Sequence, residues 1–314
     1  MNVSVIMLTY NRQEYVARAI EAILAQTMKE FEFVIVDNGS TDNSGKIAEE
    51  YAKRDSRIKV IHLEKNINIS TGRNAGLRAA TGTYITFVDD DDFCEPDMLE
   101  FLYELAIEND AEIAICGSMK EVNGEILPNY VYDEKLVMTA AESVVEMLRR
   151  KRYNAAEPTK MIHRRLFEEV QFRPDRTIDD ISTMYKYFAL AKKVVAHGIP
   201  KYCFWRHPGN ISIFTTNDKL WTAERLDEYF LAFRERTEYL SQMHPEIADY
   251  VQYSEWSYMI SMCNKIIKNN LPNCEKQLEY VQTELTKHYE EFYNSSFIEG
   301  FEKEYMKQYI EGLR

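Results

Sequence analysis

The strongest chemical feature of the sequence is a run of four aspartates at positions 89–92, directly after the apolar segment 84–88. Neighbouring anions repel one another, so such a run is costly unless a cation lies among them. Oxygen ligands at this density suit Mg²⁺ or Mn²⁺, which commonly bridge a protein carboxylate to substrate phosphates. Taken alone, the run is also typical of a buried strand that ends in a solvated acidic loop, and we favour that plainer interpretation for an isolated run.

Three other polar segments have the residue types of a binding site. Residues 9–12 read Thr-Tyr-Asn-Arg after the apolar run that begins at Val3, and residues 37–42 read Asp-Asn-Gly-Ser-Thr-Asp after the apolar run 31–36. Asp179 and Asp180 precede a helical pattern over 181–192, where a helix dipole favours negative charge. Asp, Asn, Gly and Ser also form ordinary turns, so segment 37–42 alone does not specify a site.

The elements expected around these segments alternate. Apolar runs predict strands at 3–9, 31–36, 58–61, 83–88 and 111–116, and helical spacing predicts helices at 14–26, 44–54, 70–80 and 96–109. Such alternation predicts an α/β fold with a mostly parallel sheet and helices on both faces. In these sheets ligands bind beyond the carboxyl ends of the strands. The polar segments after the first, second and fourth strands therefore share one rim, which favours a site over a solvated loop.

The rest of the chain is less regular. A hairpin turn is expected at 124–128, helices at 139–152 and 163–170, and strands at 194–199 and 202–205. From residue 217 onward the pattern is helical and rich in Tyr, Glu and Lys, with no chemistry visible in it.

Composition limits the classes of partner. The 314 residues carry a formal net charge of −13, which argues against bulk binding of nucleic acid. Five scattered cysteines without metal-ligand spacing are typical of reduced thiols, and we expect a cytoplasmic protein. We see no signal peptide and no apolar run long enough to span a bilayer. Peripheral association with the inner face of a membrane, and homo-oligomerisation through the C-terminal helices, stay open.

Five motifs occur in an order that identifies a family. They are 3–11 (Val-Ser-Val-Ile-Met-Leu-Thr-Tyr-Asn), 25–27 (Ala-Gln-Thr), 36–42 (Val-Asp-Asn-Gly-Ser-Thr-Asp), 72–76 (Gly-Arg-Asn-Ala-Gly) and 87–92 (Phe-Val-Asp-Asp-Asp-Asp). The chain thus resembles family-2 glycosyltransferases of the GT-A (Rossmann-like) fold. The resemblance is strong over 1–100, the expected nucleotide-sugar-binding half. It is weaker over 101–215, the expected acceptor-binding half with the catalytic base, and absent over 216–314, the expected C-terminal helical region.

The resemblance implies roles for the donor-binding residues. Thr9, Tyr10 and the pair Asp37–Asn38 are expected to line the base and ribose pocket, together with Asn11. Many relatives have a second Asp where this chain has Asn38, and an amide can still recognise uracil. The resemblance implies that Arg73 reaches the base or pyrophosphate and that Arg206 contacts the diphosphate. An ordinary polar helix face is the alternative for Arg73, and it is the expectation for Arg18 and Arg78.

The aspartate run corresponds to the Asp-x-Asp element of the family. The resemblance implies Asp91 as the direct ligand of Mn²⁺ or Mg²⁺, Asp90 as a ribose contact and Asp89 as support for donor and metal. Asp92 is expected to face only water. His207 has the residue type of a further metal ligand, and a surface histidine in a turn is the equal alternative.

Family members use a carboxylate as general base, and Asp180 occupies that position, with Asp179 positioning donor or acceptor hydroxyls. A neighbouring carboxylate raises the pKa of such a base whereas the helix dipole lowers it, so the net direction stays open. Both acids are also typical of helix capping. Trp205 and Trp221 suit either stacking on a sugar or core packing. No role is assigned to His62, His163, His197, His244 and His288.

We therefore expect an inverting, metal-assisted glycosyltransferase. Its donor is expected to be a UDP-hexose or UDP-N-acetylhexosamine, and its acceptor a hydroxyl of a glycan, lipid-linked or protein-linked substrate. The alternative is a non-catalytic nucleotide- or glycan-binding module on the same fold. A dinucleotide-dependent oxidoreductase is disfavoured, because the first strand is not followed by Gly-x-Gly-x-x-Gly.

Overall fold

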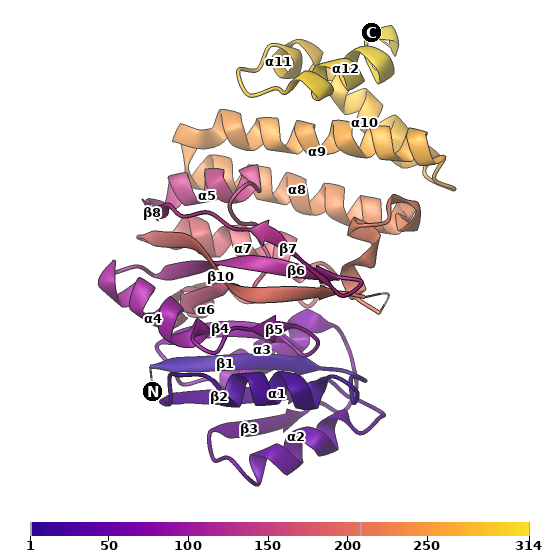
Figure 1. The fold of residues 1–314 in the computed structure, drawn as a ribbon. Coiled ribbons are helices and arrows are strands. Elements are labelled where there is room, and N and C mark those ends of the chain that lie inside the picture. Colours follow the sequence, from indigo (N-terminus) through magenta and orange to yellow (C-terminus); the bar gives the residue numbers. More distant parts are fainter. Residues whose placement is uncertain (1, 208, 314) are drawn as a thin grey trace. The chain divides into compact units, whose positions relative to one another are not determined.

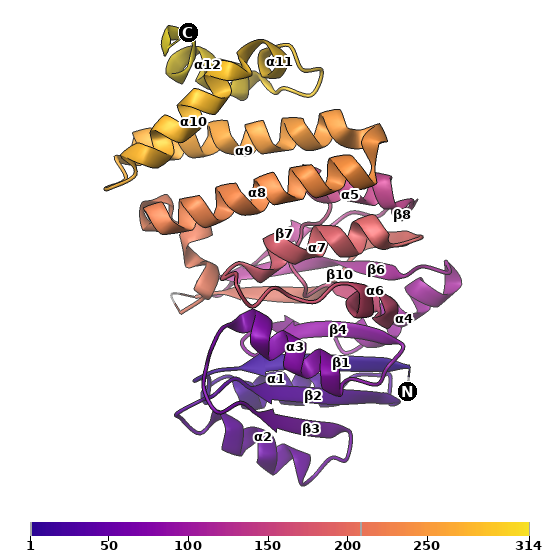
Figure 2. The ribbon, with the colours of Figure 1, turned by 180° about the vertical axis from the view of Figure 1, so that it is seen from behind.

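The structure is a computed structural model that describes residues 2–207 and 209–313. The chain divides into two compact units, Met1–Arg206 and His207–Arg314 (Figures 1 and 2). The boundary expected after residue 215 falls inside the second unit, and the division of the preceding residues into two halves stays a prediction.

The first unit is built on one sheet in the order β3-β2-β1-β4-β9-β6-β10-β5, with β7 paired to β6 and β8 paired to β10. Strands β3, β2, β1 and β4 run parallel, as do β6 and β10, whereas β9 is antiparallel to both β4 and β6. The strands are β1 (Val3–Thr9), β2 (Phe31–Asp37), β3 (Ile58–His62), β4 (Tyr84–Asp89), β5 (Phe93–Cys94), β6 (Ile113–Val122), β7 (Glu125–Tyr130), β8 (Lys135–Met138), β9 (Lys160–His163) and β10 (Val194–Arg206).

Helices cover both faces of this sheet. One face carries α1 (Val16–Leu24), α2 (Ser44–Ala52) and α4 (Met98–Glu108), and the apolar sides of these helices join a core with β1 and β2. The opposite face carries α3 (Ile69–Ala79), α6 (Arg164–Glu169) and α7 (Asp179–Leu190), which lie in front of the sheet in Figure 2. The expected α/β fold, with a mostly parallel sheet between helices, is confirmed.

Local signals account for several boundaries in the second half of the unit. Helix α5 (Ala140–Arg149) begins at a capping box in which Thr139 and Glu142 satisfy each other's backbone N–H groups. Strands β6 and β7 form the expected hairpin, but its turn is shorter than the expected 124–128. The turn contains Asn123 and Gly124, both with positive φ, and residues 125–128 pair with β6 as part of β7. The strands expected at 194–199 and 202–205 are instead one strand, β10, whose register shifts around Pro200. Proline interrupts the ladder there without ending the strand.

Sequence patterns did not predict three short strands, β5, β8 and β9. Each has four residues or fewer, too few for a clear alternation of apolar and polar side chains. Strand β9 begins with Lys160, a residue that is typically exposed but is fully buried here. Its charge obscured the strand in the sequence.

The second unit is helical, as expected. It contains α8 (Ala223–Met243), α9 (Ala248–Asn269), α10 (Glu275–Lys287), α11 (Tyr289–Tyr293) and α12 (Gly300–Tyr309), with short 3₁₀ turns between them. Trp221 is 4% exposed and packs edge-on against Phe214, with ring centroids 4.9 Å apart, so core packing is its role. Within the described part of the chain, none of the helices has the length and apolarity needed to cross a membrane.

Candidate active site

The rim of the sheet brings three of the predicted polar segments together. Thr9 at the end of β1 is in register with Asp37 at the end of β2, and Leu8 is in register with Asp89 at the end of β4. The backbone N–H of Asn38 also donates to the carbonyl of Thr9 at 2.9 Å. The expectation that these loops share one edge of the sheet is confirmed.

Asn11 joins the loop after β1 to the loop after β2. Its φ of 53° lies in the left-handed region, which asparagine tolerates better than most residues. Its Oδ1 accepts from the N–H of Thr41 at 2.9 Å, and its own N–H donates to the hydroxyl of Ser40 at 3.1 Å. Tyr10 beside it is 42% exposed, so its ring is available at the mouth of the site.

Three polar atoms at this rim are buried and have no well-formed hydrogen bond to any described residue. They are Oγ1 of Thr9, Oδ1 of Asn38 and Oδ2 of Asp90. The side chains of Thr9 and Asp90 are neighbours, and their interaction lowers the pKa of Asp90. Buried polar groups are normally satisfied, and exceptions commonly mark a site that a ligand, ion or water completes. The three atoms come from the three strand ends that the sequence predicted to meet. They are therefore candidates for contacts with a bound ligand.

The aspartate run itself is buried rather than solvated. Asp90, Asp91 and Asp92 are each no more than 7% exposed. The expectation that Asp92 faces water is wrong: its Oδ1 accepts from the backbone N–H of Trp205 at 2.7 Å. Strand β10 reaches this loop because β5 pairs with it, and β5 was not foreseen.

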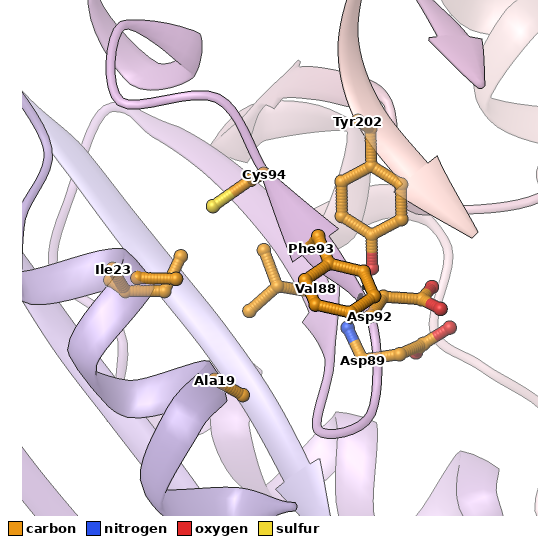
Figure 3. Close-up of a pocket in the computed structure, with 9 residues that line it drawn as sticks. Ala19, Ile23, Val88, Asp89, Asp92, Phe93, Cys94 and Tyr202 are labelled. Atoms are coloured by element: carbon orange, nitrogen blue, oxygen red, sulfur yellow. Dashed lines mark hydrogen bonds between the residues drawn. The ribbon is translucent and has the colours of Figure 1, made fainter. Parts of the chain in front are cut away.

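Tyr202 of β10 supports the same loop from behind. Its hydroxyl accepts from the backbone N–H of Asp89 at 3.1 Å, and Figure 3 shows it directed toward Asp89 and Asp92. Tyr202, Asp89 and Asp92 also line a small cavity whose other lining is largely apolar and includes Ile23 and Val88. Tyr202 thus gives the loop a polar contact at the edge of an apolar cavity.

Arg18 is a residue that sequence reasoning missed, since a polar helix face was the expectation for it. Its Nη2 donates to the backbone carbonyl of Asp91 at 2.7 Å. Its guanidinium lies 4.2 Å from the ring centroid of Phe93 and 5.1 Å from that of Trp205. Arginine stacks readily on aromatic faces, so Arg18 fixes the loop without neutralising a carboxylate.

Crowding of the carboxylates changes their acidity. Desolvation raises the pKa of Asp89 to about 6, although the positive charges of Arg73 and Arg206 oppose the shift. Desolvation also raises the pKa of Asp90 to about 8; a hydrogen bond with the side chain of Thr9 opposes this shift, and the negative charge of Asp91 adds to it. The pKa of Asp92 is raised well above its ordinary value for the same reasons. A divalent cation bound among these carboxylates would stabilise their charged forms and so lower their pKa values.

The residues present fit a divalent cation of the Mg²⁺ or Mn²⁺ type. Among the described residues no three His, Cys, Asp or Glu side chains surround a common metal position. The donors are instead hard carboxylate oxygens crowded at one loop, where burial and mutual repulsion raise the pKa values of Asp89 and Asp92. Mg²⁺ is commonly held by one or two carboxylates together with substrate phosphates, so this donor set suits a metal shared with a nucleotide.

Arg73 lies at the centre of a buried ion cluster. Its Nη1 pairs with the carboxylates of Glu157 and Asp179, and the side chains of all three are at most 10% exposed. Its guanidinium also lies 5.3 Å from the ring centroids of Phe87 and Phe172. Arg73 is therefore held between two rings and two acids, and the ordinary polar helix face is excluded for it. Glu157 was not predicted, because its neighbours carry no recognisable pattern.

The motif around Arg73 has a steric reason for its other residues. Gly76 lies so close to β1 that an added Cβ would be 2.5 Å from Cγ2 of Ile6. Asn74 is 6% exposed and exchanges two hydrogen bonds with the backbone of Phe172, at 2.8 and 3.1 Å. The motif thus packs α3 against the sheet and ties it to the segment that leads into α7.

Helix α7 begins at Asp179, so both predicted acids lie at a helix N-terminus. Oδ1 of Asp180 accepts from the N–H of Ile181 at 2.7 Å. Desolvation, followed by the charge of Asp179, raises the pKa of Asp180 above its ordinary value. The sequence left open whether the pKa of Asp180 is raised or lowered. In the structure it is raised, which suits a general base. The nearby Lys160 is fully buried, which lowers its pKa to about 8.

Arg206 and His207 lie on opposite sides of the boundary between the units. Arg206 ends β10. Its positive charge partly opposes the rise in the pKa of Asp89, in keeping with a position near the acidic loop. In the second unit, the N–H of His207 donates to Oδ1 of Asn210 at 2.7 Å, and its Nδ1 accepts from the N–H of Gly209 at 3.2 Å. A role of His207 as metal ligand stays a prediction.

Comparison with known proteins identifies a family for this arrangement. Residues 4–171 match the family described as "Glycosyl transferase family 2". Glycosyltransferase GlyG of Streptococcus pneumoniae is 33% identical over 238 residues, which cover 72% of this chain and 78% of GlyG. Glycosyltransferase GlyA of the same species is 29% identical over 83% of this chain, but the match spans only 38% of GlyA.

A solved structure has the same fold. Staphylococcus aureus TarS, residues 1–349 in complex with UDP-GlcNAc, superimposes with a TM-score of 0.75 at 20% sequence identity. The superposition covers 91% of this chain and 81% of the TarS chain.

Proposed function

The chain belongs to glycosyltransferase family 2 and is a glycosyltransferase, and from this premise we propose that it transfers a sugar from a UDP-sugar to an acceptor hydroxyl with inversion. The observation that carries the proposal is the meeting, at one edge of the sheet, of the buried aspartate run with two buried polar atoms, Oγ1 of Thr9 and Oδ1 of Asn38, that have no well-formed hydrogen bond to any described residue. Each of these groups has a chemically suitable counterpart in a nucleoside diphosphate sugar.

The donor's nucleoside is assigned to the first two loops. Asp37 and Asn38 offer a carboxylate and an amide to the uracil edge, with Oδ1 of Asn38 still unpaired. Thr9, Tyr10 and Asn11 complete the pocket wall. Asp90 is assigned to the ribose, whose hydroxyls would donate to its buried carboxylate.

The diphosphate is assigned to the aspartate loop. Asp91, supported by Asp89, would hold Mn²⁺ or Mg²⁺ there, with His207 as a further candidate ligand. When bound, such an ion neutralises charge on the departing diphosphate. Arg206 is assigned to the diphosphate on the strength of its influence on Asp89. Arg73 is assigned to a contact with the base or the pyrophosphate, and its buried ion pairs with Glu157 and Asp179 and the rings of Phe87 and Phe172 hold it in place.

The transfer step is assigned to the N-terminus of α7. Asp180 takes the proton from the acceptor hydroxyl as that oxygen bonds to the anomeric carbon. The bond between the anomeric carbon and the phosphate oxygen breaks with its electron pair on UDP. A carboxylate with a raised pKa is suited to this work, and Asp179 is assigned to orient hydroxyl groups beside it.

The reaction is proposed to take place in the cytoplasm, where thiols stay reduced, and all five cysteines of the chain are unpaired in the structure. The acceptor is a glycan, lipid-linked or protein-linked hydroxyl. The likeness of the fold to that of the TarS complex supports UDP-N-acetylhexosamine as one donor to test. Membrane association and homo-oligomerisation stay predictions.

Donor hydrolysis tests the proposal directly. We would measure UDP release from UDP-glucose, UDP-galactose, UDP-N-acetylglucosamine and UDP-N-acetylgalactosamine with Mn²⁺, with Mg²⁺ and with EDTA. Release from one of these donors that depends on a divalent ion is the expected result. UDP binding without release from any donor or acceptor mixture would instead support a non-catalytic nucleotide-binding module.

A further inference from the structure

His62 lies between two carboxylates at the rear of the proposed uracil pocket. It ends β3, in register with Asp37 at the end of β2. Its Nδ1 lies 2.9 Å from Oδ2 of Asp37, and its Nε2 lies 3.0 Å from Oε1 of Glu49 on α2. Hydrogen bonds to these two acids raise the pKa of the imidazole. The ring therefore connects a residue of the proposed site to a helix outside it.

Both oxygens of the Asp37 carboxylate have a hydrogen-bond partner within the first unit. Asp37 is 6% exposed, and its Oδ1 accepts from the N–H of Ser40 at 2.9 Å. At Gly45 an added Cβ would be 2.2 Å from Oδ2 of Asp37 and 3.1 Å from Cε1 of His62. The absence of a side chain at Gly45 thus leaves room for this pair, and His62 and Ser40 set the plane of the carboxylate.

We propose that His62 is a positioning residue of the donor site, which fixes the carboxylate of Asp37 for recognition of uracil. This inference rests on the proposed function. The uracil edge presents an N3–H donor beside a carbonyl, whereas the cytosine edge presents an acceptor beside an amino group. A carboxylate in a fixed plane accepts from N3–H, and a freely rotating one loses orientation and discrimination. Glu49 holds the far side of the ring and so fixes its tilt.

Two substitutions at His62 separate positioning from bulk. Asparagine places an N–H donor where Nδ1 lies and keeps the hydrogen bond to Asp37, whereas leucine keeps the volume and removes the donor. The side chain of His62 is 47% exposed, so neither change disturbs a buried core. We would measure the affinity of the full chain for UDP and for CDP by calorimetry. The donor KM and kcat would be measured with whichever UDP-sugar the hydrolysis screen shows to be a donor.

We expect His62→Leu to weaken UDP binding by about three- to tenfold, the scale of one hydrogen bond. Its preference for UDP over CDP should fall by a similar factor, and the loss should appear in the donor KM rather than in kcat. His62→Asn should restore most of both. Glu49→Gln should give a smaller loss of UDP affinity in the same direction.

Three outcomes would overturn the inference. The first is a His62→Leu variant that binds UDP and discriminates against CDP as the wild type does. The second is a loss in kcat alone, and the third is an equal loss in the asparagine and leucine variants. Failure of the wild type to bind UDP at all would overturn the proposed function, and with it this inference.

Discussion

Nη1 of Arg73 lies 2.7 Å from Oδ2 of Asp179, and the two side chains are 6% and 10% exposed. This ion pair joins α3, which packs beside the proposed nucleotide loops, to the first residue of α7, which carries the proposed base. Glu157 completes the cluster from the segment before β9. The proposed donor-binding and base-bearing parts of the first unit are therefore connected by charges that are almost fully buried.

Removing the positive charge of Arg73 from this cluster should destabilise the first unit. Arg73→Met leaves the carboxylates of Glu157 and Asp179 buried without their partner, and breaking a buried ion pair from one side costs about 3–5 kcal/mol. We expect that loss in the free energy of unfolding, measured by urea denaturation. Arg78→Met is the matched control, since Arg78 is an exposed arginine on the same helix. Equal stability of the two variants would show that the cluster contributes little.

Asp91→Ala should abolish metal-dependent release of UDP from the donor, because Asp91 is the proposed ligand of the divalent ion. UDP release would be followed at increasing Mn²⁺ and Mg²⁺ concentrations. Glu95→Ala is the control, since it removes an exposed carboxylate a few residues along the chain. Asp91 would lose its assignment if its alanine variant kept wild-type activity and metal dependence.

Asp180→Asn should retain UDP binding and lose transfer by about 10²-fold or more, the usual scale for a general base. The amide matches the carboxylate in size and cannot take a proton. Binding would be measured by calorimetry and transfer by product formation at saturating donor. Asp175→Asn, in the exposed segment before α7, serves as control. Transfer at the wild-type rate in Asp180→Asn would assign the base elsewhere.

Much of the first unit could be predicted because its signals are local. Continuous apolar runs identified β1, β2 and β4, and their parallel order was enough to place Thr9, Asp37 and Asp89 at one edge. The motif containing Arg73 was recognised by resemblance, although its burial was not. The sequence was therefore enough to predict which loops, those after β1, β2 and β4, meet at this edge and which polar residues they carry.

Contacts between segments far apart in the sequence could not be predicted. Asp92 was expected to face water because the sequence around it does not indicate that β5 pairs with β10. That pairing brings the backbone N–H of Trp205 to the carboxylate of Asp92. Arg18 appeared to be one more charge on a helix, and only the folded chain places it on the carbonyl of Asp91. Likewise, the role of Glu157 depends on its ion pair with Arg73, which lies in helix α3, far from Glu157 in the sequence.

The pH dependence of transfer should report the pair at the start of α7. Because the charge of Asp179 contributes to the raised pKa of Asp180, Asp179→Asn should lower that pKa. A base is active when deprotonated, so the acidic limb of the kcat profile should move to lower pH, whatever the change in maximal rate. Profiles of the wild type and the variant, each scaled to its own maximum, would test this. An unmoved limb, or one moved to higher pH, would contradict the coupling.

The pH dependence of stability should report His62 independently of turnover. Hydrogen bonds to Asp37 and Glu49, the charged groups that contact it, raise its pKa in the folded chain above the ordinary 6.5. A raised pKa stabilises the fold fully below the unfolded value, and this contribution is lost as pH rises through the folded value. The stability of the wild type relative to His62→Leu should therefore be greatest below about pH 6.5 and decline above it. Urea denaturation between pH 5.5 and 8.5 would measure the difference, with His62→Asn as the non-titrating control. A difference that is constant with pH, or that grows as pH rises, would exclude the imidazolium bridge between the two carboxylates.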